Sequence, residues 1–166
     1  ASALMGLMDP GDGIILFEPF YGYHLNAATL AGIEAQFVPF PGPSLELREA
    51  DIRAAIKPNS KAIVICTPNN QSGKMWTEAE INLVGKIANE KNLIVITDEM
   101  YEYFRYDKRP HISPASLPLL KDRTVTLMGL SKTFSITGWR LGYVAAPKPL
   151  ADKIRLANDL FYVCAP

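Results

Sequence analysis

The sequence places a lysine, Lys132, eight residues before an arginine, Arg140, with the aromatic residues Phe134 and Trp139 between them. A lysine amine attacks a carbonyl carbon only after it has lost its proton, and a neighbouring cation or an apolar setting favours that loss. Arg140 and an apolar collar formed by Phe134 and Trp139 would provide such a setting. A single lysine is most often a solvated side chain, so the other polar residues must decide whether Lys132 is a nucleophile.

Polar residues gather in three segments, each at or just after the end of a predicted strand. Asn69-Asn70-Gln71-Ser72-Gly73 follows one strand, Asp98 to Tyr101 ends the next, and Ser131-Lys132 follows the one after that. Ligands of open α/β sheets bind beyond the carboxyl ends of the strands, where the loops converge. We therefore expect the three segments to face one cleft.

Short runs rich in β-branched residues alternate with amphipathic stretches along the whole chain. We predict strands over residues 13–17, 35–40, 61–67, 93–98, 124–129 and 141–146, and helices over residues 21–31, 45–56, 77–90 and 148–159. Thr77 and Glu80 form a capping box at the start of the third helix. The alternation predicts an α/β fold with a mainly parallel sheet, whose strands are apolar on both sides because helices cover both faces.

Composition excludes several classes of protein. The 166 residues are 48% hydrophobic and 20% charged, which is typical of one compact domain. Seventeen basic residues balance seventeen acidic ones without a basic run, so we expect no nucleic-acid partner. The apolar runs are far shorter than the roughly 20 residues of a membrane span, so we expect no membrane insertion. Cys66 and Cys164 form no CxxC pair, and we expect reduced, structural thiols and a cytoplasmic location.

Three segments resemble the central motifs of the class I and II aminotransferases, a fold type I family that depends on pyridoxal 5′-phosphate (PLP). The segments are TPNNQSGK, TDEMYEYFRY and GLSKTFSITGWRLGY, and the last is similar to the family pattern S-K-x-F-x-x-T-G-W-R-x-G-Y. The likeness covers essentially all 166 residues in the right order, from DPGD through EPFYGY to AAPKPL. It implies that residues 1–166 are the large PLP-binding domain of such an enzyme.

We also expect this domain to be incomplete at both ends. Residues 1–8 have the composition of the last turns of a helix, and the chain does not begin with methionine. The resemblance implies that a glycine-containing phosphate loop lies before Ala1. It likewise implies that a small C-terminal domain, with the arginine that holds the substrate carboxylate, lies beyond Pro166.

The resemblance assigns roles to four residues at the aldehyde, the phosphate and the pyridine nitrogen of the cofactor. Lys132 would form the Schiff base with PLP, and Arg140 would bind the phosphate through two parallel hydrogen bonds. Ser131 would be a second phosphate contact. Asp98 would pair with the protonated pyridine nitrogen, which keeps the ring an effective electron sink.

Three further residues would hold the cofactor ring, namely Tyr101 and Asn70 at its 3′-oxygen and Tyr21 stacked on its face. Glu99 has no assigned role.

Two positions depart from the family pattern, because Gln71 stands where a proline, often cis, is usual and Gly129 stands where a serine is frequent. Either the bond before Gln71 is trans and Asn70 is re-aimed, or a strained cis bond is retained. The glycine would remove one hydroxyl contact to the phosphate.

The activity that the resemblance implies is transamination between an amino acid and a 2-oxo acid, with Lys132 as nucleophile and as general base. A PLP-dependent carbon–sulfur β-lyase and a noncatalytic PLP-binding domain remain open as alternatives. The resemblance also implies a homodimer, with the loop Tyr21–His24 at the interface.

Overall fold

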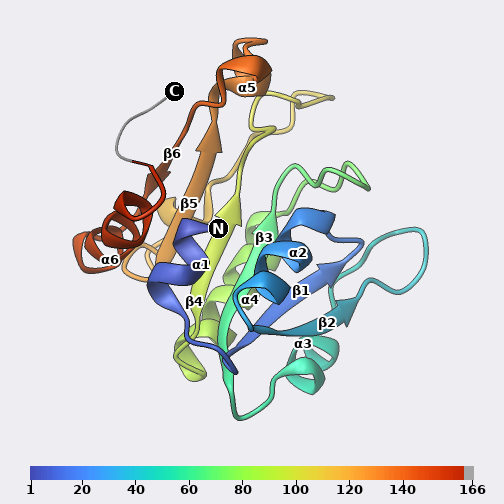
Figure 1. The fold of residues 1–166 in the computed structure, drawn as a ribbon. Coiled ribbons are helices and arrows are strands. Elements are labelled where there is room, and N and C mark those ends of the chain that lie inside the picture. Colours follow the sequence, from blue (N-terminus) through green and yellow to red (C-terminus); the bar gives the residue numbers. More distant parts are fainter. Residues whose placement is uncertain (163–166) are drawn as a thin grey trace.

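Six strands form one sheet in the computed structural model, which describes residues 1–162 (Figure 1). The strand order is β2-β1-β3-β4-β5-β6, and only β6 runs antiparallel to its neighbour. The strands are β1 (Gly13–Glu18), β2 (Glu34–Pro39), β3 (Ser60–Cys66), β4 (Ile94–Asp98), β5 (Thr124–Gly129) and β6 (Gly142–Ala145). The predicted mainly parallel α/β sheet is confirmed.

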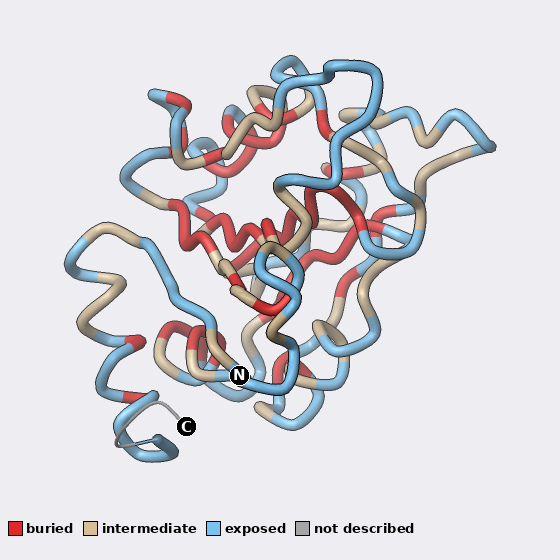
Figure 2. Tube along the Cα trace, turned by 90° about the horizontal axis from the view of Figure 1, so that it is seen from above, coloured by how far each residue is buried: buried red, intermediate tan, exposed pale blue. Residues whose placement is uncertain are grey.

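Helices cover both faces of the sheet, as predicted. The helices α1 (Ser2–Leu7), α2 (Gly22–Leu30) and α6 (Lys148–Asp159) pack on one face, and α3 (Glu49–Ala55) and α4 (Glu78–Glu90) pack on the other (Figure 1). Successive strand residues point to opposite faces, so in β1 Ile14 and Leu16 join the first layer while Ile15 and Phe17 join the second. The buried central strands run through the middle of the molecule between these layers (Figure 2).

Local sequence signals set several helix ends. Thr77 caps α4 as predicted, because its Oγ1 accepts from the Glu80 amide at 3.3 Å while Glu80 Oε2 accepts from the Thr77 amide at 2.8 Å. The predicted start of the second helix at Leu45 is wrong, and α3 begins at Glu49. Leu45 has a φ of 51°, in the left-handed region, which a right-handed helix cannot include.

The expectation that every strand is apolar on both sides fails at the two edges of the sheet. β1 and β3 are almost continuously buried, whereas residues of β2 alternate and all four residues of β6 are exposed. β2 and β6 are the two edge strands, so they lie at the margin of the helical layers and part of their side chains meets solvent. No helix within residues 1–162 is long and apolar enough to cross a bilayer.

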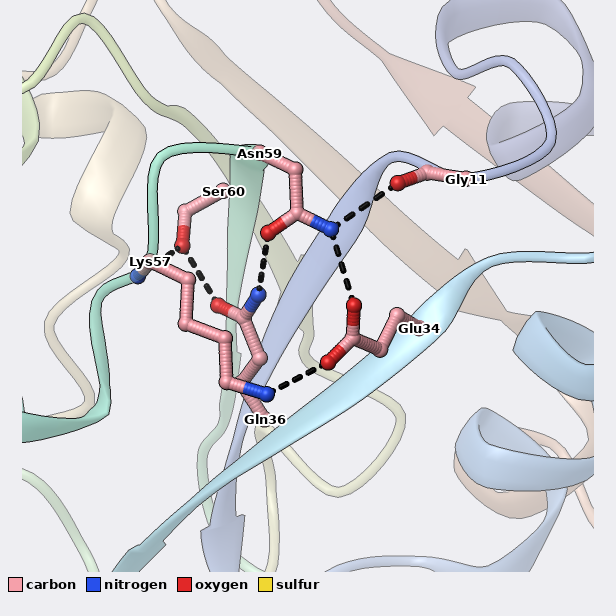
Figure 3. Close-up of polar contacts among 6 residues, drawn as sticks. All are labelled: Gly11, Glu34, Gln36, Lys57, Asn59 and Ser60. Carbon is pink, nitrogen blue, oxygen red and sulfur yellow. Dashed lines mark hydrogen bonds and ion pairs between the residues drawn. The ribbon is translucent and has the colours of Figure 1, made fainter.

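A network of polar side chains closes the amino ends of β1, β2 and β3 (Figure 3). Asn59 donates to the Gly11 carbonyl and to Glu34 at 2.9 Å each, and it accepts from Gln36 Nε2 at 3.0 Å. Gln36 is only 3% exposed, and Ser60 Oγ donates to its Oε1. The network satisfies buried polar groups at the end of the sheet opposite to the carboxyl ends of these strands.

Candidate active site

One cavity of about 330 Å³ at the carboxyl ends of the strands is lined by all seven residues to which the resemblance assigned a role. Its volume lies within the range of roughly 300–1,000 Å³ that is usual for small-molecule pockets. The three polar segments therefore converge as expected. The lining residues are Tyr21, Tyr23, Cys66, Asn70, Asp98, Met100, Tyr101, Ser131, Lys132, Thr137 and Arg140.

Asp98 ends β4, and its carboxylate is held on both oxygens. The Met100 amide donates to Oδ1 at 3.2 Å, and His24 Nε2 lies 2.9 Å from Oδ2. A carboxylate only accepts hydrogen bonds, so the imidazole of His24 donates. His24 comes from α2, three residues after Tyr21, and the pair ties this helix to the carboxyl end of β4.

Tyr101 and Asn70 meet in the cavity from two different loops. Asn70 Nδ2 lies 2.6 Å from the phenolic oxygen of Tyr101, and the amide donates. Tyr101 lies in the turn after β4 and Asn70 in the loop after β3. Neighbouring parallel strands bring both donors to the same side of the cavity, as required if both are to bind one oxygen of a ligand.

Lys132 and Ser131 lie on α5 (Leu130–Thr133), a short helix that follows β5 directly. Ser131 is buried, whereas Lys132 is exposed. The predicted apolar collar around Lys132 is wrong, because Phe134 and Trp139 are 63% and 66% exposed. The chain turns away after α5, through Ser135 with a φ of 56°, so these rings point outward instead of closing over the amine.

Arg140 follows the short 3-10 helix η2 (Thr137–Trp139) and reaches the cavity from a left-handed backbone conformation with a φ of 54°. Its Nη1 donates to the Thr137 carbonyl at 2.9 Å. Within residues 1–162, no acid lies within ion-pair distance of Arg140 or of Lys132. A cavity lined by two cations that have no acidic partner favours an anionic ligand.

Tyr21 caps the start of α2, and its ring packs edge-on against Tyr23 and His24, with centroid separations of 5.1 Å and 5.5 Å. Partial burial, followed by the charges of neighbouring phenols and of Asp98, raises the pKa of the Tyr21 phenol above its ordinary value. Tyr21 therefore stays protonated at neutral pH and offers the cavity an uncharged aromatic ring.

The aminotransferase class I and II family model matches residues 1–166. The chain is 36% identical to an aspartate aminotransferase of Musicola paradisiaca and 34% identical to human kynurenine–oxoglutarate transaminase 1. The matches cover 98% and 97% of this chain but 41% of each relative. The crystal structure of the aromatic aminotransferase of Pyrococcus horikoshii superposes with a TM-score of 0.93 at 32% identity, over 99% of this chain and 44% of that one.

The chain belongs to the class I and II aminotransferase family. Members of this family depend on PLP, and the fold is that of fold type I enzymes. The chain spans about two fifths of the length of the curated relatives that it matches.

The residues of the cavity fit PLP by their chemistry. Lys132 offers a primary amine for the cofactor aldehyde, Arg140 offers a cation for the phosphate, and Asp98 offers an anion for the pyridine nitrogen. Asn70 and Tyr101 offer hydrogen-bond donors. When bound, PLP would supply the electron sink that stabilises a carbanion next to an amino group.

The structure describes both positions at which the chain departs from the aminotransferase pattern, Gln71 and Gly129. The only cis peptide bonds within residues 1–162 are Glu18–Pro19 and Thr67–Pro68, so the bond before Gln71 is trans. At Gly129, a Cβ atom would lie 2.2 Å from Cε of Met100. The Met100 side chain thus fills the space that a serine would need at this position.

Cys66 lies on the wall of the aminotransferase cavity, at the end of β3. Burial, followed by the charge of Asp98, raises the pKa of the Cys66 thiol to about 12. The thiol therefore stays protonated at neutral pH, and it is a free, buried cysteine. Cys164, the other predicted structural cysteine, lies outside the described residues.

The sequence analysis left Glu99 without a role and placed His24 only in the expected interface loop, and the structure pairs each of them with another side chain. Glu99 is 2% exposed, accepts from Ser113 Oγ at 2.9 Å and lies 2.6 Å from His111 Nε2. The two histidines of the chain thus contact two consecutive acids, His24 at Asp98 and His111 at Glu99. A second acid directly after Asp98, at the end of β4, was the sequence signal for the second pair.

Proposed function

We propose that Lys132 binds PLP covalently in this cavity and that the protein transfers an amino group between an amino acid and a 2-oxo acid. One observation carries the proposal, namely that the seven residues selected from the sequence line one cavity in which Lys132 and Arg140 have no acidic partner within residues 1–162. The family membership of the chain supports it.

Each side chain has a proposed task. The Lys132 amine would be the nucleophile that holds the cofactor through its aldehyde, and once free it would move the α-proton of the amino-acid substrate. Asp98, oriented by His24, holds the proton on the pyridine nitrogen. Arg140 and Ser131 bind the phosphate.

The ring of the cofactor has its own proposed contacts. Asn70 and Tyr101 donate to its 3′-oxygen, and Tyr21 packs on its face. Tyr21 suits this position because its phenol stays uncharged at neutral pH.

The substrate class is proposed only as amino acids and 2-oxo acids. The names of the relatives refer to aspartate, kynurenine and aromatic substrates. A substrate screen of the full-length protein with PLP tests the proposal, with a 2-oxo acid as acceptor. Transamination predicts a new amino acid in step with loss of the donor, and no free ammonia.

A cysteine conjugate distinguishes the two PLP reactions. Transamination converts the conjugate to its 2-oxo acid, whereas a carbon–sulfur β-lyase releases the thiol, pyruvate and ammonia. Release of the thiol as the main product, with no amino-group transfer to any 2-oxo acid, would contradict the proposed function.

We also propose that the protein is a homodimer and acts in the cytoplasm. Exposed aromatic rings beside the cavity support an interface there, with Tyr23 68% and Trp139 66% exposed. The absence of a CxxC pair supports the proposed location. Sedimentation tests the assembly, and a monomer with full activity would contradict it.

A further inference from the structure

The loop after β3 presents Asn70 to the cavity although it lacks the proline that the family pattern has at position 71. A proline would restrict the backbone beside Asn70 through its ring. Another feature must therefore hold Asn70 in place, since its amide meets the Tyr101 phenol at 2.6 Å while Asn70 itself is exposed.

The side chain of the preceding residue, Asn69, folds this loop. Asn69 is 8% exposed, and its Oδ1 accepts from the Gln71 amide at 3.0 Å, the Ser72 amide at 2.9 Å and the Ser72 hydroxyl at 2.9 Å. The amide of Gln71 is a donor that a proline at this position would not have. With glutamine instead of proline at position 71, the loop can form the first of these three hydrogen bonds, from the Gln71 amide to Asn69 Oδ1.

The other end of the Asn69 side chain reaches a second loop of the site. Asn69 Nδ2 donates to the Pro19 carbonyl at 3.1 Å, two residues before Tyr21. The Asn69 backbone closes the turn, because its amide donates to the Lys74 carbonyl and its carbonyl accepts from the Gly73 amide, both at 2.9 Å.

The far end of the turn is anchored as well. Lys74 Nζ lies 2.6 Å from Glu80 Oε1 at the start of α4, and it stands over the rings of Phe40 and Trp76 at 5.1 Å and 5.6 Å from their centroids. With this end fixed, the position of Asn70 depends on the hydrogen bonds that Asn69 makes at the near end.

We propose that Asn69 is a positioning residue of the cofactor site, which takes over the role of the missing proline and couples the Asn70 loop to the Tyr21 loop. The polar atoms of its side chain are all engaged with the protein, so Asn69 acts through Asn70 and Tyr21 and not by contact with the cofactor. The link to PLP rests on the proposed function, whereas the effect on the loop does not.

The test compares Asn69→Ala with Asn59→Ala in the full-length protein. Asn59 is the matched control. Its Nδ2 also donates to a backbone carbonyl, that of Gly11, and to the Glu34 carboxylate, but it lies at the opposite end of the sheet (Figure 3). In the cofactor-free protein, Asn69→Ala should speed amide hydrogen exchange at Gln71 and Ser72 and separate Asn70 Nδ2 from the Tyr101 phenol in a crystal structure. Asn59→Ala should do neither.

Equilibrium dialysis with PLP gives the second readout. Asn69→Ala should weaken PLP binding about tenfold. Added to Asn70→Ala, the same change should cause a smaller further loss, because only the route through the Tyr21 loop remains. Gln71→Pro should restore part of the affinity in the Asn69→Ala background. If Asn69→Ala does not fold, Asn69→Asp keeps the acceptor oxygen but loses the donor to Pro19, and it should loosen the Tyr21 loop alone.

Two results would overturn the proposal. One is an unchanged Asn70–Tyr101 contact in a folded Asn69→Ala protein or, where that variant does not fold, an unchanged Tyr21 loop in Asn69→Asp. The other is equal loss of PLP affinity in Asn59→Ala. Absence of PLP binding by the unmodified protein would instead contradict the proposed function, while the exchange and crystal results would still decide the role of Asn69.

Discussion

The imidazole Nε2 of His24 lies 2.9 Å from Oδ2 of Asp98, and the two side chains are only 15% and 16% exposed. The residues are 74 positions apart in the sequence. Their contact means that the carboxylate at the end of β4 is oriented by α2 before any ligand binds, which is the preorganisation that an electrostatic role requires.

The first prediction concerns the charge of Asp98. Asp98→Asn keeps the size of the side chain but removes the charge that would hold the pyridine nitrogen protonated. We expect covalent PLP binding to persist and single-turnover proton abstraction to slow by at least about a hundredfold, measured by stopped-flow absorbance.

Glu99→Gln is the control for this variant, because Glu99 is the adjacent acid and contacts His111 and Ser113 instead of the cavity. It should lower stability without a comparable loss of the proton-abstraction rate. Near-normal deamination by Asp98→Asn would show that Asp98 has only a structural role at the end of β4.

A second prediction follows from the close approach of Gly129 and Met100. Gly129→Ser should cost less than about 1 kcal/mol of stability, because the atoms that must move are the flexible end of the Met100 side chain, and Met100→Ala should remove that cost in the double variant. Gly138→Ser is the matched control, since a Cβ at Gly138 meets nothing within 4 Å. Denaturant unfolding of the unmodified protein, the two single variants Gly129→Ser and Met100→Ala, and the double variant measures the coupling. Additive effects would show that Met100 does not occupy this space.

A third prediction concerns the acid stability of the α4 capping box. Burial alone would raise the pKa of Glu80, but hydrogen bonds from Lys74 and Thr77 outweigh it and hold the pKa below its usual value. Because the folded pKa is lowered, the stabilisation is present above the unfolded pKa of about 4.3 and is lost as the pH falls through the folded pKa.

Glu80→Gln should therefore lower the free energy of unfolding by about 2 kcal/mol at pH 7 and less at pH 3. Glu78→Gln, an exposed change in the same first turn, should leave the pH dependence intact. Urea unfolding at both pH values measures this, and an equal loss at both would show that the Glu80 charge is not involved.

The fourth prediction is that Cys66 is unreactive. With a thiol pKa of about 12, only about one molecule in ten thousand carries the thiolate at pH 8. In a Cys164→Ser background, iodoacetamide should modify Cys66 slowly in the native protein and fast in urea. Rapid alkylation of the native protein would mean that the cavity wall at Cys66 is open to solvent and the thiol is activated.

The sequence was sufficient for features that depend on local patterns. β5 and α6 have the predicted bounds, because hydrophobic periodicity and flanking turn residues define such elements. The convergence of Asn70, Asp98 and Lys132 followed from the rule that parallel strands gather their carboxyl ends at one edge.

Features that depend on long-range packing were missed or wrong. The pairs His24–Asp98 and Glu99–His111 join residues 74 and 12 positions apart, which no local pattern predicts. The predicted collar of Phe134 and Trp139 failed because the direction of a side chain after a short helix depends on backbone dihedrals, here the left-handed Ser135 and Arg140. Spacing alone does not specify these dihedrals.

The most direct test of the central claim is the identity of the lysine that binds the cofactor. Full-length protein with PLP should show a visible absorption band, and borohydride reduction followed by peptide mapping should place the phosphopyridoxyl group on Lys132. Lys132→Ala should abolish both the band and the label, while Lys148→Arg, a change at an exposed lysine of α6, should leave them in place. A reduced adduct on any other lysine, with Lys132 unmodified, would contradict the account.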